Sequence, residues 1–424
     1  MTIELKKFKN EAKRLLSLAR TWSKVTPVQF FFYLDQMGII QTTVHDQTQW
    51  ASVWMPGSTG LAEPVVVDLR SIELIVDLDS AVNTGNILLE KKEHRNKLRM
   101  VAEDAKADVT APVVRLLKPA EKQSIALSIN QESIPIPAVV AARIVATHRR
   151  MAKQRTFGTE HNERMFCLRV AKERVYLEAT NSAALVRWSN ALPGKEDDAF
   201  VLDVDELYGV ERFLAKRDSE WYIKEVTGGI LIESGRGKVK LLPPRWSVSA
   251  FPTFEQAISP VEHLPIALEL ELCSLINALK AVTKRRKKDE VVVKFDLGKI
   301  SDAKDVSWTS KQRICTQVLS WDETQSCYKI EHTVGVGEGR LSIRKDEVPA
   351  SRDEYIPAPY LSASELLALL TEFKDEVVVM RWEASRSANT NKLEVVRPVH
   401  VEVTGKWEWL LLQMPIRVPN KKMN

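Results

Sequence analysis

Residues 5–24 of the chain read LKKFKNEAKRLLSLARTWSK, in which apolar and basic residues recur with helical spacing. The apolar members are Leu5, Phe8, Ala12, Leu15, Ala19 and Trp22. Because they follow one another at steps of three and four, they predict a single buried face of an α-helix. The basic members with the same kind of spacing are Lys6, Lys9, Lys13, Arg20 and Lys24, which predict a separate cationic face.

Two further segments have the same character, at residues 135–155 and 271–288. The starts of the three segments are 130 and 136 residues apart. A period of this length indicates whole domains in tandem, because solenoid repeats are much shorter. The sequence therefore predicts three domains, over residues 1–118, 119–259 and 260–424, with linkers near Lys118-Pro119 and Ser259-Pro260.

Positive charge is concentrated in these three segments. Lys and Arg outnumber Asp and Glu by seven to one in the first, five to none in the second and six to one in the third. Together the segments carry +16, whereas the 424-residue chain carries +5, so the rest of the chain is acidic. This distribution indicates one surface that faces a polyanion.

Each basic helix is followed by β-branched and aromatic alternations broken by polar turns, which predict strands. A short second helix then begins after a capping residue, which is Asp68, Asp203 or Ser362. Further strand patterns close each copy. The predicted fold class is α+β, with helices on one side of antiparallel sheets. The charged stretch 344–359 is the expected insertion in the third copy.

Several glycine pairs predict turns. Gly228-Gly229 and Gly235-Arg236-Gly237 predict tight turns between strands. The stretch 335–340 lacks the Lys-Ser/Thr of a phosphate-binding loop and predicts a hairpin between strands 328–333 and 339–343.

Composition and spacing exclude several classes of site. The four Cys contain no Cys-x-x-Cys pair, which argues against a zinc ribbon and a disulfide framework and favours reduced thiols. The seven His form no metal-binding spacing, so no metal, cofactor or catalytic residue is predicted. No stretch approaches the length of apolar residues that spans a bilayer, and the first residues do not form a secretory signal. We expect a cytoplasmic, nucleoid-associated protein that is not an enzyme.

Local motifs then occur in an informative order. Residues 176–185 read YLEATNSAAL, residues 250–254 read AFPTF, residues 376–379 read EVVV, and residues 412–418 read LQMPIRV. In this order, they are similar to four segments of the bacterial DNA sliding clamp. These are the Ala-Thr-Asp-Gly-His-Arg-Leu strand, the Phe-Pro-Asp-Tyr turn, a strand of the third domain and the Met-Pro-x-Arg-Leu ending. With the threefold repeat, the chain resembles this family, the beta subunit of DNA polymerase III, along its whole length.

The resemblance has two departures from the family pattern. Ser182-Ala183-Ala184 stands where the family has Gly-His-Arg, and residues 419–424 continue past the usual end. Both departures fall at the family's protein-docking site, so the ligand preference of this chain is expected to differ.

The resemblance implies half of a six-domain ring, closed by a homodimer, with helices that line a hole for double-stranded DNA. Contacts of Lys and Arg with phosphates carry no sequence information. The DNA-facing candidates are Lys6, Lys9, Lys13, Arg20, Lys24, Arg143, Arg150, Lys153, Lys284, Arg285, Lys287 and Lys288.

The resemblance also implies a peptide pocket between the second and third domains, for a replicative polymerase and a clamp loader. By position it would use Thr180, Ser182, Leu185, Pro252, Ala257, Leu412, Met414, Pro415, Ile416 and Arg417. An apolar groove suits short peptides with hydrophobic anchors. The leading hypothesis is a sliding clamp that acts as a processivity factor. The alternatives are a clamp-fold adaptor that does not close and a nucleic-acid-processing enzyme.

Overall fold

The computed structural model describes residues 2–22, 27–43, 47–55, 61, 63–77, 86–92, 97–102, 107–130, 132–153, 165–214, 219–243, 247–252, 254–255, 258–284, 291–300, 307–322, 327–349, 354–373, 376–386, 393–395, 397–404 and 408–416. These residues fall into two compact units. Unit 1 is Met1–Ala142 with Leu202–Arg245, and unit 2 is Arg143–Val201 with Trp246–Asn424. The unit boundaries therefore lie inside the predicted second domain, and each unit is described by itself below.

The order strand, helix, four strands, helix, three strands occurs three times. The first copy contains β1 (Thr2–Glu4), α1 (Leu5–Trp22), β2 (Val28–Tyr33), β3 (Gln36–Thr42), β4 (Thr48–Trp54), β5 (Val65–Val67), α2 (Leu69–Val76), β6 (Asn86–Lys92), β7 (Lys97–Ala102) and β8 (Ala107–Leu116). The second contains β9 (Ile134–Pro137), α4 (Ala138–Ala152), β10 (Met165–Ala171), β11 (Arg174–Thr180), β12 (Ala184–Ala191), β13 (Asp198–Asp203), α5 (Val204–Leu214), β14 (Glu220–Val226), β15 (Gly229–Ser234) and β16 (Gly237–Leu241).

The third copy contains β17 (Ile266–Glu271), α6 (Leu272–Thr283), β18 (Val292–Asp296), β19 (Ser307–Asp322), β20 (Cys327–Arg344), β21 (Leu361–Ser362), α7 (Ala363–Leu370), β22 (Val377–Trp382), β25 (Val399–Thr404) and β26 (Glu408–Gln413). It adds a small hairpin, β23 (Ser385–Arg386) with β24 (Leu393–Glu394). Short 3-10 turns lie at Val248–Ala250, Val261–His263, Lys345–Glu347 and Thr371–Phe373. The predicted α+β class and the threefold order of first helix, strands and second helix are confirmed. The third predicted helix is shorter than expected, because α6 ends at Thr283 and Lys284 is its C-cap.

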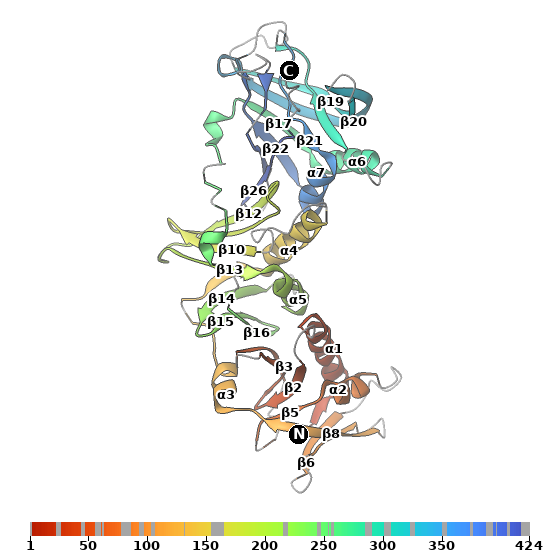
Figure 1. Ribbon diagram of the computed structural model, residues 1–424, viewed down its shortest axis with the longest axis vertical. Coiled ribbons are helices and arrows are strands. Elements are labelled where there is room, and N and C mark those ends of the chain that lie inside the picture. The colour runs from red at the N-terminus through yellow and green to blue at the C-terminus, as the bar shows by residue number, and fades with distance from the viewer. Residues whose placement is uncertain are drawn as a thin grey trace, which may run out of the picture. The chain divides into compact units, whose positions relative to one another are not determined.

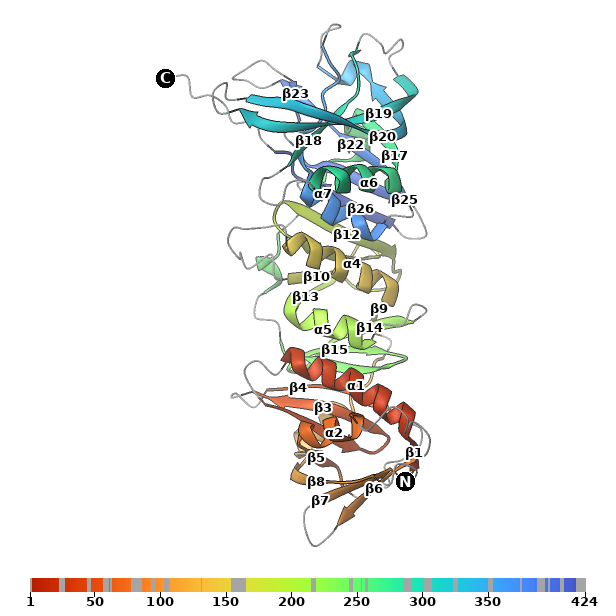
Figure 2. The same ribbon diagram turned by 90° about the vertical axis from the view of Figure 1, so that its right-hand side faces the viewer.

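In unit 1, twelve antiparallel strands form one sheet in the order β1-β6-β7-β8-β5-β2-β3-β4-β16-β15-β14-β9. Helices α2, α1 and α5 lie on one face of this sheet (Figures 1 and 2). Phe8 of α1 stacks on Phe32 of β2 with ring centroids 6.5 Å apart. Gly209 lets α5 approach α1 closely, because a Cβ there would lie 2.7 Å from a methyl carbon of Leu18. The apolar face predicted for the first helix is thus buried against the sheet and α5.

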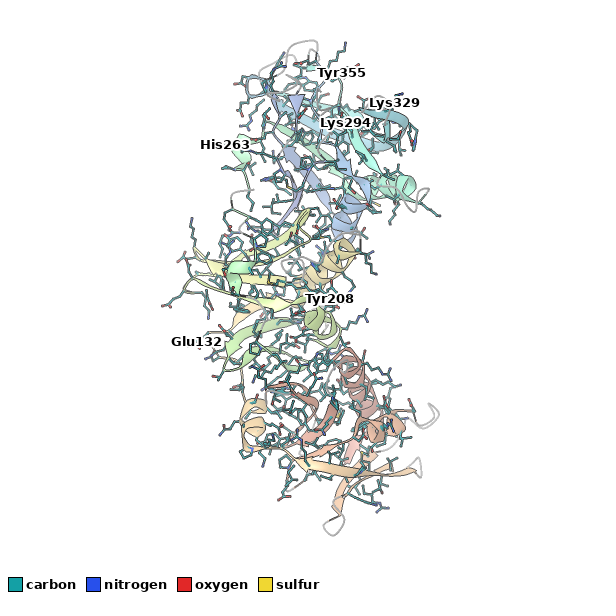
Figure 3. The ribbon with its side chains drawn as sticks, in the orientation of Figure 1. Glu132, Tyr208, His263, Lys294, Lys329 and Tyr355 are labelled. Carbon is teal, nitrogen blue, oxygen red and sulfur yellow. The ribbon has the colours of Figure 1, made fainter. Side chains whose placement is uncertain are left out.

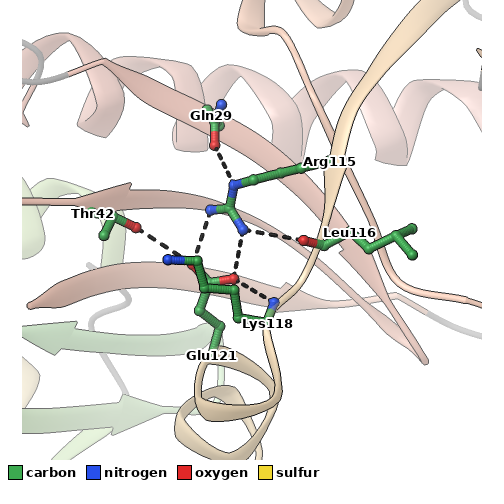
Figure 4. Close-up of polar contacts among 6 residues, drawn as sticks. All are labelled: Gln29, Thr42, Arg115, Leu116, Lys118 and Glu121. Atoms are coloured by element: carbon green, nitrogen blue, oxygen red, sulfur yellow. Dashed lines mark hydrogen bonds and ion pairs between the residues drawn. The ribbon is translucent and has the colours of Figure 1, made fainter. Parts of the chain in front are cut away.

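The opposite face of this sheet is covered by α3 (Pro119–Ile125), a helix in the predicted linker at Lys118-Pro119. Ile125 packs with Phe31 and Trp50 in one apolar cluster. The Arg115 guanidinium donates to both oxygens of the Glu121 carboxylate at 2.6 and 2.9 Å, which fixes α3 to the end of β8 (Figure 4). The predicted linker therefore contains an ordered helix that packs on the sheet.

In unit 2, the sheet order is β13-β10-β11-β12-β26-β25-β22-β17-β20-β19-β18-β21. Its helices α4, α7 and α6 lie on one face (Figures 1 and 2). His148 of α4 lies against Phe166 of β10, with ring centroids 5.1 Å apart. The predicted N-caps are confirmed at Asp68, which accepts from the Arg70 N–H, and at Ser362, which accepts from the Glu365 N–H.

The predicted hairpin at 335–340 is wrong, because β20 continues through these glycines as one strand of 18 residues. Its pairing with β19 shifts register between Ile314 and Cys315, where Val336 is the extra residue of a β-bulge. The glycines accommodate this bulge, and Gly337 has φ +134°. By contrast, the turns predicted at Gly228 and at Gly235-Arg236 are confirmed.

Candidate nucleic-acid surface and partner pocket

Helix α1 presents several cations on the side away from the sheet. Lys6, Lys13 and Arg20 are exposed, and Arg20 lies 3.5 Å from Glu73 of α2. Lys7, which is not among the predicted DNA-facing cations, is also exposed. Its place in the same basic run was the signal that could have identified it.

Lys9 does not belong to this exposed set. Only 3% of its surface is accessible, so the prediction that it lies on the cationic face is wrong. Lys9 directly follows Phe8 and precedes Ala12 by three positions, and both of these residues are buried. The helical stripe that faces the sheet is therefore wide enough to include position 9.

The cations of α4 are engaged within unit 2. The Arg143 guanidinium donates to Glu376 at 2.6 Å and lies over the rings of Phe373 and Trp409, at 5.1 and 5.6 Å. The Arg150 guanidinium donates to Glu372 at 2.6 Å, with half of its side chain exposed. Lys153 is exposed at the end of the helix. Arg143 is thus mainly a packing residue, and Arg150 already has an anionic partner.

Lys280 of α6 and Lys284, the residue that follows the helix, are both exposed. Lys280 is not among the predicted DNA-facing cations. The remaining predicted cations, Lys24, Arg285, Lys287 and Lys288, lie outside the described residues.

All described residues of the predicted peptide pocket belong to unit 2. Strand β12 pairs with β26, and this register places Leu185 opposite Leu412. The Met414 N–H donates to the Ala183 carbonyl at 2.8 Å, and the Ile416 N–H donates to the Tyr360 carbonyl at 2.7 Å. The structure therefore brings the C-terminal segment to the turn between β11 and β12, as the resemblance implies.

Some of the predicted pocket residues are buried, and others are at least partly accessible to solvent. Thr180, Leu185, Leu412 and Pro415 are buried, whereas Ser182 and Met414 are exposed and Pro252 and Ile416 are half-buried. The buried residues can therefore form only the floor of the predicted peptide pocket. Ala257 and Arg417 lie outside the described residues.

The turn between β11 and β12 is held rigidly by local hydrogen bonds. The Asn181 side-chain oxygen accepts from the Ala183 and Ala184 N–H groups at 3.2 and 2.8 Å, and its amide donates to the Met151 carbonyl at 3.3 Å. Ser182 adopts the left-handed conformation, with φ +66°. This conformation is uncommon for a residue other than glycine, so the rest of the turn must enforce it.

A segment that we name the strap, residues 247–252 and 254–255, covers the face of β10–β12 opposite α4 (Figure 1). Phe251 packs with Met165, Cys167 and Val201. The Glu255 carboxylate lies 2.5 Å from the Arg169 guanidinium and 3.4 Å from that of Arg187. The strap is thus fixed by an apolar contact at one end and by ion pairs at the other.

Three titratable groups in and beneath the strap, those of Glu178, Glu255 and Cys167, have shifted pKa values. Burial raises the pKa of Glu178, against the opposing attraction of Arg187 and Arg169. Burial also acts to raise the pKa of Glu255, but a backbone hydrogen bond and the two arginines outweigh it, so this pKa is lowered. Burial raises the pKa of Cys167 to about 12, and the nearby Glu178 charge adds to the effect. Cys167 is therefore a neutral thiol near neutral pH.

The described residues contain no group of three or more His, Cys, Asp or Glu side chains arranged to hold a metal ion. Within the same residues, no helix is both long and apolar enough to cross a membrane.

We compared the fold of the chain with those of solved structures. The DNA polymerase III subunit beta from Pseudomonas aeruginosa superposes with a TM-score of 0.65 at 13% identity, over 98% of this chain and 99% of that chain. The chain has the sliding-clamp fold. The beta subunit from Thermotoga maritima gives a TM-score of 0.63 at 13% identity, and the DNA polymerase sliding clamp from Bacillus subtilis gives 0.64 at 12% identity, each over 99% of both chains.

No protein-family model and no curated protein sequence matches the chain. The chain thus shares the sliding-clamp fold with solved clamps to which it is only 12–13% identical in sequence. Full coverage of both chains means that the three copies of the element order correspond to the whole clamp subunit.

Proposed function

We propose that this protein is a DNA sliding clamp, a processivity factor that encircles duplex DNA as a homodimeric ring and carries no catalytic activity of its own. In this proposal the three copies are the domains 1–118, 119–259 and 260–424. The observation that carries the proposal is the full-length sliding-clamp fold with exposed cations on the helix side of the sheets. A ring needs only weak, salt-sensitive phosphate contacts, because closure around the duplex prevents dissociation.

The pattern of strand pairing supports closure of such a ring. The fourth strand of the first copy, β4, pairs with the last strand of the second copy, β16. The fourth strand of the second copy, β12, likewise pairs with the last strand of the third copy, β26. The fourth strand of the third copy, β20, and the last strand of the first copy, β8, have no such pairing partner among the described strands and remain available for one further joint. We propose that β20 of one subunit pairs with β8 of the other.

The edges of these two strands suit that joint. Residues 327–338 of β20 pair with β19 on one side and with no other described strand. Residues 107–112 of β8 likewise pair with β7 alone among the described strands. Ile330 is 58% exposed, and the neighbouring Lys329 lies at the surface (Figure 3). An exposed strand edge with apolar side chains is a template for pairing with another chain.

Clients would bind at the joint of β12 and β26. The proposed partners are a replicative DNA polymerase and a clamp loader, which would insert short hydrophobic peptides over Leu185, Leu412 and Met414. The exposed Met414 suits varied side chains, because a thioether adapts its shape. The proposed site of action is the nucleoid in the cytoplasm.

The experiment that tests the proposal compares DNA with and without ends. Protein bound to nicked circular plasmid is isolated by gel filtration, and the plasmid is then cut once with a restriction enzyme. Encirclement predicts that the protein leaves the DNA after the cut, whereas a mock-treated circle retains it. Equal retention on both templates would overturn the ring.

A second candidate function is a clamp-fold adaptor that recruits replication or repair proteins without closing. The ion pairs of Arg143 and Arg150 with Glu376 and Glu372 favour it, because they reduce the positive charge that α4 offers to DNA. Sedimentation separates the two functions. A monomer at micromolar concentration indicates the adaptor, and a dimer indicates the ring.

A further inference from the structure

Two arginines under the strap form a site with the geometry of a carboxylate acceptor. Arg169 of β10 and Arg187 of β12 both lie over the ring of Tyr176 of β11, at 4.6 and 5.4 Å from its centroid. The ring holds the two guanidiniums in place on the strand face. Their common ligand is Glu255 of the strap, at 2.5 and 3.4 Å.

The charges of this site do not balance without Glu255. Glu178 is buried beneath the arginines, bonded to Arg187 and 3.8 Å from Arg169. It neutralises one of the two positive charges, so a single positive charge remains. Because Glu178 is bonded to Arg187, removing Glu255 would leave that positive charge on Arg169, whose side chain is three-quarters buried, and this would be costly. One carboxylate balances the site, whereas a phosphate dianion would leave a negative charge.

Glu255 is the accessible carboxylate of this site. Its side chain is 51% exposed, in contrast to that of Glu178, which is 4% exposed. It belongs to an irregular segment and not to a helix or strand. The structure therefore shows the acceptor filled by the chain's own carboxylate, at a position that solvent and other molecules can reach.

The acceptor lies next to the proposed peptide floor. Alternate residues of a strand share one face, so Leu185 and Arg187 of β12 lie on the same side, about 7 Å apart along the strand. Thr180 and Glu178 share that side of β11, because Thr180 pairs with Leu185 and Glu178 with Arg187. A peptide anchored over Leu185 and Leu412 reaches Arg187 within about two residues.

We propose that Arg169 and Arg187 form a recognition site for an acidic side chain of a partner peptide, adjacent to its hydrophobic anchor, and that Glu255 occupies this site in the free protein. The proposal rests on the peptide pocket of the proposed function. It adds a chemical requirement to that pocket, namely a carboxylate at a fixed distance from the anchor. Binding exchanges one carboxylate for another and releases the strap at Glu255.

The first experiment tests the acceptor without any peptide. Glu255→Ala empties the site, and its melting temperature is measured in 0.2 M sodium acetate and in 0.2 M sodium chloride. We expect acetate to raise the melting temperature of this variant by about 1–2 °C relative to chloride, because a ligand that binds only the folded state stabilises it. The wild type and the matched control Glu408→Ala, which removes another arginine-bound glutamate of the same sheet, should show no difference.

The second experiment tests the partner chemistry. The first set of ten-residue Gly/Ser peptides contains a Leu-Leu pair at a fixed position and one Asp, which is placed at each remaining position in turn. The second set is identical except that Asn replaces Asp. We expect Glu255→Gln to bind at least one Asp peptide about tenfold more tightly than its Asn counterpart. In the wild type this preference should be smaller, because Glu255 competes.

The outcomes separate the two proposals. No acetate effect on Glu255→Ala overturns the acceptor, and equal binding of Asp and Asn peptides overturns the acidic partner. If acetate stabilises Glu255→Ala but no peptide of either set binds, the acceptor is supported and the pocket of the proposed function is contradicted.

Discussion

At the scale of single residues, Arg143 shows how a predicted DNA contact becomes a structural residue. Its guanidinium is three-quarters buried, bonded to Glu376 and placed over two aromatic rings. Arg150, two turns further along α4, forms a similar ion pair but stays half exposed. The same residue type on one helix therefore contributes differently to stability, because only Arg143 is shielded from water.

We predict that Arg143→Ala lowers the free energy of unfolding by about 2 kcal/mol, because it leaves Glu376 without its donor and removes the stacking on Phe373 and Trp409. Arg150→Ala should change it by less than about 0.5 kcal/mol. Urea unfolding followed by fluorescence measures both values. Equal losses in the two variants would contradict the assignment.

Cys167 is a second test at this scale. Its pKa of about 12 means that at pH 8.5 its thiolate fraction is about a thousandfold below that of an ordinary thiol. We predict that iodoacetamide modifies the exposed Cys273 within minutes and Cys167 only after denaturation. Peptide mass spectrometry measures both rates. Similar rates in the native protein would show that the strap does not protect Cys167.

At the scale of elements, the long β19–β20 hairpin distinguishes the third copy. These strands have 16 and 18 residues, whereas the corresponding β3 and β4 have 7 each. The extra length extends β20 past the end of β17 and leaves its edge available. This edge is the element on which ring closure depends in the proposed function.

In the proposed function the protein is a dimer at micromolar concentration. We predict that Ile330→Asp is a monomer there, because a charge on a paired edge must be desolvated in the joint. Tyr355→Asp is the matched control, since Tyr355 is exposed in the same copy but lies outside β20 (Figure 3). Analytical ultracentrifugation measures both masses. A dimer in both variants would place the joint elsewhere.

At the scale of the whole molecule, the proposed function assigns the contact with DNA to the exposed cations of a few helices. Lys6 and Lys13 are exposed on α1, and Lys280 and Lys284 are exposed on α6 and at its end. Outside the three basic segments the chain is acidic. Such contacts act through released counterions, so their number can be read from the dependence of affinity on salt.

We predict that Lys6→Gln combined with Lys13→Gln reduces the slope of log affinity against log salt by about 2 on a linear duplex, because each lost phosphate contact removes about 0.9. The control pair, Lys97→Gln with Lys172→Gln, has the same change in charge on exposed strand or turn residues and should leave the slope unchanged. Fluorescence anisotropy at several NaCl concentrations measures the slopes. A similar drop in both pairs would indicate a general charge effect.

The sequence by itself determined the elements and their repetition. Periods of 3.6 and 2 residues reflect local burial, so they predicted α1, the second helices and most strands, whereas the third basic run begins only where α6 ends, at Thr283. They failed where local signals were ambiguous. The glycines at 335–340 predicted a turn, but a β-bulge uses the same conformational freedom within a continuous strand.

Only the tertiary structure decided which residues are available. The sequence cannot show that Lys9 is buried, that Glu376 neutralises Arg143 across 233 positions, or that the strap places Glu255 on Arg169 and Arg187. These contacts join segments far apart in the chain, and no local period encodes them. A side chain's charge is a property of the sequence, but its partner is a property of the fold.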